Sequence, residues 1–273
     1  MPQRARKDRR VNKDSYLLAG HAPGQPDRHA ALSAIFDWWT LRHLDAVGIG
    51  PGWRCWEVGA GGPMVARWLA GRVGPTGHVL ATDLDVSRLV EAAGPAVEVR
   101  RHDVVSDPVP PAAFDLVHAR LVLVHLPARE RVLRSLAGVL RPGGWLVIED
   151  ADPGLQPLAC LDGHGPEEAL ANKVRSAFRV LLTGRGVDLG YGRTLPRRLR
   201  EAGLTDVAAD AYFPVTLPAC AELEVATVTV LRDQLVTGGH LAVEEVERHL
   251  GNVAAGRLDL AQPPLISAWG RRP

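Results

Sequence analysis

A glycine-rich turn followed by an acidic residue is the first feature of this sequence that could do chemistry. Residues 56–63 read WEVGAGGP, and they end a short apolar run and open a helix-like segment. Glycine lets the backbone turn sharply and lets a ligand approach the peptide groups closely. Asp83 ends the next apolar run, where a carboxylate can accept both hydroxyl groups of a ribose. The pattern indicates a nucleoside-containing ligand.

Glu57, two residues before the first glycine, indicates which charge that ligand carries. A dinucleotide would place its pyrophosphate at this turn, and a nearby carboxylate would repel it. The dinucleotide pattern G-x-G-x-x-G is also incomplete, because Met64 stands where its last glycine would be. An adenosyl ligand with a sulfonium and an ammonium group suits both Glu57 and Asp83. A turn without a ligand and an NAD-dependent oxidoreductase are the alternatives.

Polar residues after the later apolar runs are candidates for acid–base work. The candidate catalytic residues are His118, His125 and Asp150, because the carboxyl ends of parallel strands form a ligand crevice. Each also has a structural interpretation, as a core or cofactor-pocket histidine, a helix cap and a turn residue, respectively. Asp103 is either an acceptor for an adenine amino group or a turn residue. Further polar candidates are Glu149, Asp152 and His164.

The elements that must position these residues alternate between residues 53 and 150. Short apolar runs cover 55–58, 79–81, 97–99, 114–117 and 145–148, and helix-like segments cover 65–69, 86–93 and 129–140. Strands and helices alternating at this spacing predict βαβ units and a parallel sheet. The runs contain little polar alternation, which is typical of strands covered by helices on both faces.

Mainly helical segments flank this core. Helical spacing occurs at 30–36 and 41–47, then at 167–182, 195–202, 221–236 and 243–250, with strand candidates at 207–213 and 264–269. We therefore expect an N-terminal helical segment over the cofactor site (1–52) and a cofactor-binding core (53–150). We expect residues 151–273 to form a helical substrate cap and a final β-hairpin that completes the same sheet.

Composition narrows the class of protein. The chain has 273 residues, 46% of them apolar, and a formal charge of +1, which suits one α/β domain with insertions and excludes disordered and fibrous classes. No apolar stretch is long enough for a bilayer, and no secretory signal is recognisable. Near-neutral charge argues against a nucleic-acid binder. The three scattered cysteines fit neither a metal site nor disulfides, so we expect a cytoplasmic protein.

Several motifs, taken in their order along the chain, resemble those of the class I S-adenosylmethionine-dependent methyltransferases of the small-molecule, natural-product type. These motifs are 57–62, Asp83, Asp103, 114–117 and 140–144. The resemblance implies an α/β fold with a Rossmann-like, seven-stranded, mostly parallel sheet, helices on both faces, and helical cap elements. It assigns to the cofactor Tyr16, Glu57, Gly59, Ala60, Gly61, Asp83, Leu84, Asp103, Val104, Ala119 and Arg120.

The resemblance also implies an activity. S-adenosyl-L-methionine would donate a methyl group to a small organic acceptor, at an oxygen of a secondary metabolite, and leave S-adenosyl-L-homocysteine. The partner would be a small molecule rather than a nucleic acid or a membrane, and the chain could form a homodimer. Family members usually have a third glycine near position 63, where this chain has Pro63. Proline removes a backbone N–H donor and adds bulk at that position. The alternative is therefore a cyclisation or rearrangement with the cofactor bound but not consumed.

Overall fold

A seven-stranded sheet forms the centre of the computed structural model, which describes residues 27–111 and 113–273. The strands are β1 (Arg54–Val58), β2 (His78–Asp83), β3 (Val97–Arg101), β4 (Phe114–Arg120), β5 (Leu140–Ala151), β6 (Thr205–Tyr212) and β7 (Leu265–Arg271). Their spatial order is β3-β2-β1-β4-β5-β7-β6, and β7 alone runs antiparallel to both its neighbours. The predicted Rossmann-like sheet and its closing hairpin are confirmed.

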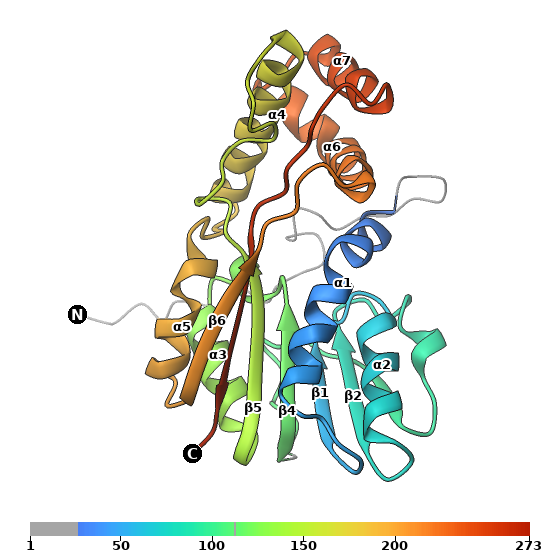
Figure 1. Ribbon diagram of the computed structural model, residues 1–273, viewed down its shortest axis with the longest axis vertical. Helices are drawn as coiled ribbons and strands as arrows, with labels where there is room; N and C mark the ends of the chain where they lie inside the picture. The colour runs from blue at the N-terminus through green and yellow to red at the C-terminus, as the bar shows by residue number, and fades with distance from the viewer. Residues whose placement is uncertain (1–26, 112) are drawn as a thin grey trace, which may run out of the picture.

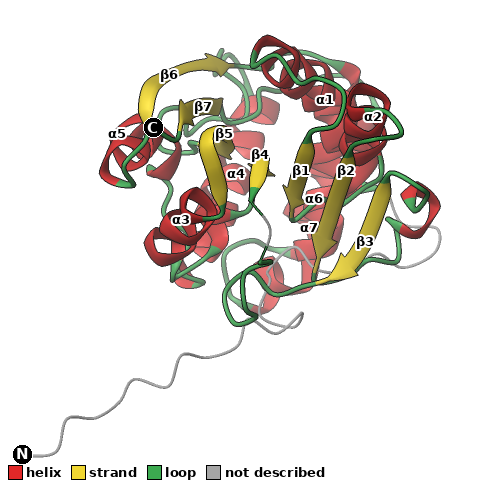
Figure 2. Ribbon diagram, turned by 90° about the horizontal axis from the view of Figure 1, so that it is seen from below, coloured by secondary structure: helices red, strands yellow, loops and turns green. Residues whose placement is uncertain are grey.

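Helices cover both faces of this sheet, as Figure 2 shows. One face carries α1 (Arg28–Ala46) and α2 (Met64–Val73), and the other carries α3 (Arg129–Gly138) and α5 (Tyr191–Glu201). The helices α4 (Pro166–Gly184), α6 (Pro218–Thr237) and α7 (Val243–Ala254) gather at one end of the sheet (Figure 1). We call these three helices the cap. Two short 3₁₀ helices, η2 (Val90–Ala92) and η3 (Leu123–His125), follow β2 and β4.

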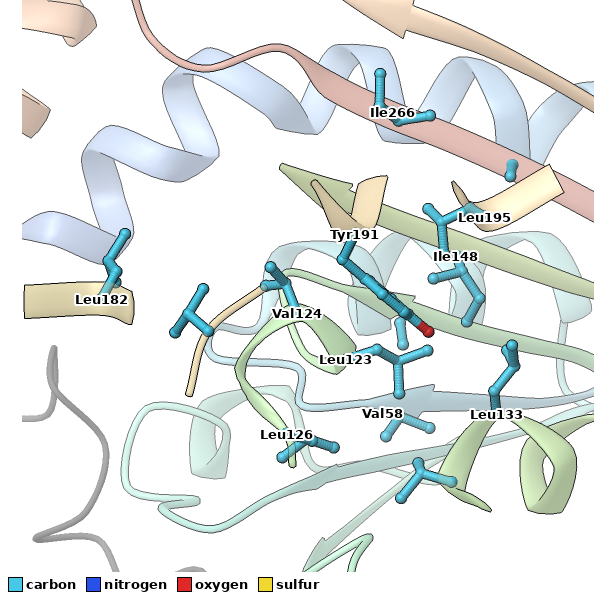
Figure 3. Packing of buried hydrophobic residues seen from close by; sticks show 14 of the residues in the cluster. Val58, Leu123, Val124, Leu126, Leu133, Ile148, Leu182, Tyr191, Leu195 and Ile266 are labelled. Carbon is cyan, nitrogen blue, oxygen red and sulfur yellow. The ribbon is translucent and has the colours of Figure 1, made fainter. Parts of the chain in front are cut away.

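Burial on both faces explains why the strands read as apolar runs. The α3/α5 face buries Val58, Leu123 and Ile148 around the ring of Tyr191 (Figure 3). The α1/α2 face buries a second apolar cluster that includes Leu69 and Val147. Fully buried strands lack a polar face, so alternation is absent from their sequence.

Local structure differs from the sequence prediction in two places. The segment 86–93 forms a turn and the short helix η2 instead of a regular helix, because the Asp85 carboxylate accepts the Ser87 N–H at 3.1 Å and Pro95 follows closely. The two N-terminal segments at 30–36 and 41–47 form one helix, α1, whose N-cap Asp27 accepts the N–H groups of His29 and Ala30.

Candidate functional site

The glycine turn after β1 has a backbone that requires glycine. Gly59 and Gly61 both have φ of +63°, in the left-handed region that side chains disfavour. A Cβ on Gly59 would lie 2.4 Å from Cγ2 of Val122, in the loop after β4. A Cβ on Gly61 would lie 3.1 Å from Nδ1 of His29, at the start of α1. The turn is therefore a tight junction between β1, the loop after β4, and α1.

Asp83 lies against this turn, as expected from its position at the end of β2. Its Oδ2 accepts the Gly61 N–H at 2.9 Å, and its Oδ1 accepts the Asp85 N–H at 3.1 Å. Ala60 donates its own N–H to the Thr82 carbonyl at 3.0 Å, which fixes the turn to β2. The adjacent Leu84 carbonyl accepts Arg101 Nε at 3.1 Å.

The residues after β3 form a turn. Asp103 Oδ1 accepts the Val105 N–H at 2.9 Å, and its Oδ2 accepts the Ser106 hydroxyl at 2.8 Å. Val104 packs against the apolar cluster of the α3/α5 face. These contacts correspond to the turn interpretation of Asp103, and they leave its adenine contact as a prediction.

Glu57 and His118 lie side by side in the interior, on β1 and β4. His118 Nδ1 donates to Glu57 Oε2 at 2.6 Å, and its Nε2 faces Glu149 Oε2 at 3.5 Å. Burial alone would lower the pKa of His118, but the two carboxylates outweigh it and raise the pKa to about 9. His118 is thus a cation between two buried acids.

The same network continues into α1 and to the edge strand β6. Glu149 also accepts hydrogen bonds from the hydroxyls of Thr40 and Ser267. His43 lies between Glu149 Oε1 at 3.2 Å and Asp210 Oδ1 at 2.8 Å. Together these polar contacts fix α1 against the strands that carry the network.

Arg120 extends the network at the end of β4. Its guanidinium donates to Asp37 Oδ1 at 2.7 Å and to the Thr40 hydroxyl at 2.9 Å. The neighbouring Ala119 is buried between β1 and β5. We did not predict the α1 partners of this network, although Asp37, Thr40 and His43 recur every three residues within a helix of apolar spacing.

A large apolar pocket lies between the end of the sheet and the cap. The cavity itself has a volume of about 90 Å³, and the free space reaches about 870 Å³ only when the open mouth and the solvent there are counted. Its walls come from α1, the loops after β4 and β5, α4 and α6. Its lining includes Leu32, Phe36, Leu121, Val124, Val174, Phe178, Leu182, Val187, Leu223, Val228, Leu231 and Leu235.

The three candidate catalytic residues occupy different places relative to this pocket. His125 lines it, whereas His118 lies in the buried network described above. Burial, with smaller effects of Arg28 and Arg129, lowers the pKa of His125 to about 3, so its imidazole is neutral at physiological pH. Asp150 accepts the Val124 N–H at 3.2 Å under the loop after β4, and burial raises its pKa well above the ordinary value.

Three aromatic residues near the cap lie outside the pocket. Tyr191, Tyr212 and Phe213 do not line it. Tyr191 is buried among apolar residues of the α3/α5 face (Figure 3), because its helix packs on the sheet below the cap. The aromatic lining consists of Phe36 from α1 and Phe178 from α4.

Other predicted residues lie outside the pocket. Pro63 forms the N-cap of α2, where its missing N–H costs no helical hydrogen bond. Asp152 accepts both the backbone and the side-chain N–H of Arg193 at 2.8 Å. Tyr16 lies outside the described residues. Among residues 27–273 without position 112, no three His, Cys, Asp or Glu side chains gather to hold a metal ion, and no helix is long and apolar enough to cross a membrane.

Comparison with known proteins identifies the family. A family model described as "Methyltransferase domain" matches residues 56–148, which run from β1 into β5. The segment 56–148 is therefore a methyltransferase domain, as the resemblance to the class I S-adenosylmethionine-dependent methyltransferases predicts. S-adenosylmethionine is the cofactor of these methyltransferases, so the predicted cofactor is confirmed.

The curated relatives are methyltransferases matched over part of their length. Methyltransferase str2 of Strobilurus tenacellus is 34% identical over 158 residues, which cover 56% of this chain and 53% of the relative. Methyltransferase GfsG of Streptomyces halstedii is 29% identical over 193 residues, covering 66% of this chain and 65% of the relative. The chain thus spans about half to two thirds of the length of these relatives.

A solved structure shares the fold of this chain. The phosphoethanolamine N-methyltransferase 2 of Haemonchus contortus, in complex with S-adenosyl-L-methionine, superposes with a TM-score of 0.55 at 16% sequence identity. The superposition covers 90% of this chain and 57% of that protein. At this identity the similarity concerns the fold alone.

Proposed function

We propose that this protein binds S-adenosylmethionine at the glycine turn and methylates an oxygen atom of a small, largely apolar organic molecule bound under the cap. The observation that carries this proposal is the adjacency of two sites at the same end of the sheet. Val122 contacts Gly59 of the turn, and its neighbours Leu121 and Val124 line the apolar pocket. One loop therefore separates the cofactor turn from the pocket.

The residues at the turn fit the cofactor of the family. Gly59 and Gly61 allow the tight turn at the end of β1, and Asp83 presents a carboxylate at the end of β2. In this proposal Asp83 holds the ribose, Asp103 and Val104 lie at the adenine, and Glu57, Ala119 and Arg120 form the surroundings of the methionine half. The bound cofactor supplies a methyl group that is electrophilic because it is attached to a sulfonium.

The shape and lining of the pocket support a small organic acceptor. Its apolar walls can exclude water from a bound molecule, and burial of apolar surface contributes roughly 25 cal/mol per Å² to binding. Residues before 53 and after 150 provide most of these walls. We therefore propose that the N-terminal segment covers the cofactor site and that the cap holds the acceptor, while 53–150 binds the cofactor.

His125 is the candidate base that lies in the pocket. Because its pKa is lowered to about 3, it stays neutral and can accept a hydrogen bond from an acceptor hydroxyl at any pH above that value. Arg28 and Arg129 disfavour its protonated form, so His125 orients the hydroxyl more effectively than it removes the proton. Holding the acceptor in the correct geometry lowers the activation barrier most in reactions where two reactants must be aligned.

Calorimetric titration of the full chain with S-adenosylmethionine tests the cofactor site. We expect binding by the unchanged protein and a loss of about tenfold or more in the Asp83→Ala variant, since a bidentate carboxylate contact is removed. Asp85→Ala is the control, because Asp85 accepts the Ser87 N–H in the same loop. No binding at millimolar cofactor would refute the proposal.

Product analysis tests the reaction. The protein is incubated with labelled S-adenosylmethionine and a panel of apolar molecules that carry one hydroxyl, and both the methylated product and S-adenosylhomocysteine are measured. We expect the two products in equal amounts. Conversion of an acceptor without S-adenosylhomocysteine would instead establish the cyclisation or rearrangement.

A further inference from the structure

The cap contains a buried charged cluster that faces the apolar pocket. Arg175 on α4 and Glu224 on α6 both line the pocket, and they are 3% and 4% exposed. Arg175 Nη2 lies 3.1 Å from Glu224 Oε2, and it donates to the Ala261 carbonyl at 3.2 Å. His249 on α7 lies behind Glu224, with Nε2 at 2.9 Å from Oε1. The cluster connects the three cap helices.

This cluster is balanced in charge. Burial opposes the ionised form of Glu224, but Arg175 and His249 outweigh that effect and hold the pKa of Glu224 at about 2. The carboxylate and the guanidinium therefore neutralise each other inside the cap. A buried ion pair is costly to desolvate and is seldom the most stable solution for a helix contact. Stability alone therefore does not explain this ion pair in an apolar wall, and a role in binding is a further explanation.

One nitrogen of the guanidinium is left over. Nη1 of Arg175 is buried and has no hydrogen-bond partner in the described part of the chain, whereas Nη2 has two. Buried donors almost always have a partner, and an unsatisfied one costs free energy comparable to its desolvation. Arg175 lines the pocket, so a molecule that enters the pocket and displaces the atoms covering Nη1 is the available source of an acceptor atom.

We propose that Arg175 is a specificity residue whose Nη1 donates a hydrogen bond to an uncharged carbonyl oxygen of the methyl acceptor. We expect this oxygen to be uncharged because Glu224 already neutralises the same guanidinium and would repel a second carboxylate beside it. Arg28, which also lines the pocket, lies on α1. This inference rests on the proposed function, since it names the chemical class of that acceptor: an apolar skeleton that carries a ketone, ester or similar carbonyl group.

Matched probes test the proposal without turnover. Equilibrium dialysis of the full chain measures the affinities of 2-acetylnaphthalene, 2-ethylnaphthalene and 2-naphthoate, which share one skeleton and differ at the oxygen. The variant Arg175→Met/Glu224→Gln removes both members of the ion pair together, so that neither is left without the other. Arg179→Met is the control, because Arg179 lies one turn further along α4 and does not line the pocket.

We expect the affinity ratio of the ketone to the hydrocarbon to fall about tenfold in the double variant, equivalent to about 1.4 kcal/mol. The hydrocarbon should keep its affinity within about twofold, and Arg179→Met should keep the ratio of the unchanged protein. We also expect 2-naphthoate to bind more weakly than the ketone. An unchanged ratio in the double variant, or tighter binding of the naphthoate, would overturn the proposal.

Titration with S-adenosylmethionine, run in parallel, separates this inference from the proposed function. Cofactor binding with an unchanged probe ratio refutes the role of Arg175 alone. If the ketone-to-hydrocarbon affinity ratio depends on Arg175 but the protein does not bind the cofactor, the proposed methyl transfer is refuted. The carbonyl site is then retained.

Discussion

His118 and Glu57 form a buried ion pair, with His118 Nδ1 2.6 Å from Glu57 Oε2, directly below the glycine turn. The acid that the sequence assigns to the cofactor is thus already balanced by an interior cation. The Nε2 atom of the same imidazole faces Glu149, so one positive charge lies between two carboxylates. The electrostatic environment of the turn is therefore set by this pair and not by Glu57 alone.

Replacing His118 should destabilise the protein strongly. In His118→Gln the buried carboxylates of Glu57 and Glu149 lose their cation, and breaking a buried pair typically costs roughly 3–5 kcal/mol. Urea unfolding at pH 7 measures the loss. His78→Gln is the control, because His78 forms an exposed pair with Glu98 at 3.4 Å, and such surface pairs contribute about 1 kcal/mol or less. Equal effects of the two variants would contradict a buried charged His118.

The contribution of His118 should depend on pH in a defined direction. Its pKa is raised from 6.5 to about 9 in the folded protein, so the stabilisation is complete below about pH 6.5 and is lost as pH rises to about 9. The difference in unfolding free energy between the unchanged protein and His118→Gln should shrink over this interval, by about 1.4 kcal/mol per pH unit. A difference that stays constant from pH 6 to 9.5 would show that His118 is not protonated.

His125 should show the opposite pH dependence. Its folded pKa is lowered to about 3, so the unfolded chain binds a proton that the folded chain does not, and stability falls as pH decreases from about 6.5. His125→Gln removes this proton uptake. Thermal unfolding between pH 7 and 4 should therefore show a smaller acid loss in the variant. An equal loss of stability in both proteins would mean that His125 is solvated and that its pKa is not lowered.

The glycine turn should tolerate a methyl group at one position and not at another. Gly59→Ala would place a Cβ 2.4 Å from Val122 at a φ of +63°, so we expect a loss of about 2 kcal/mol in stability and weaker cofactor binding. Gly62→Ala is the control, because nothing lies within 4 Å of its Cβ position and its φ is not positive. Calorimetry and thermal unfolding of both variants measure the difference. Similar behaviour of the two would argue against a tight turn at Gly59.

Filling the pocket with a larger side chain should weaken binding of the acceptor probe without changing the affinity for the cofactor. Thr227 lines the pocket from α6, so Thr227→Phe should weaken binding of 2-acetylnaphthalene about tenfold or more while cofactor affinity stays within about twofold. Thr229→Phe places the same ring on the same helix, at a position that does not line the pocket, and should leave both affinities unchanged. Loss of cofactor binding in Thr227→Phe alone would mean that the pocket holds the cofactor itself.

The sequence determined the sheet, the glycine turn and the acid at the end of β2. These features are local: an apolar run, a turn of glycines, and a strand end at a fixed chain distance from it. Parallel strands also place their carboxyl ends at one edge, so the position of Asp83 beside Gly61 follows from connectivity. The segment 86–93 shows the limit of this reasoning, since it forms a turn and the short helix η2 despite its helical spacing.

Only the tertiary structure decided which polar residues meet. His43 lies on α1 and Asp210 on β6, and Arg175 and Glu224 lie on different cap helices. The spacing of these residues along the chain therefore predicts neither contact. Their contacts depend on how helices cross the sheet and each other, which is set by side-chain packing over the whole core. The structure likewise placed His125, and neither His118 nor Asp150, in the wall of the pocket, because neighbouring residues of a strand point to opposite faces and a loop is free to turn toward the cap.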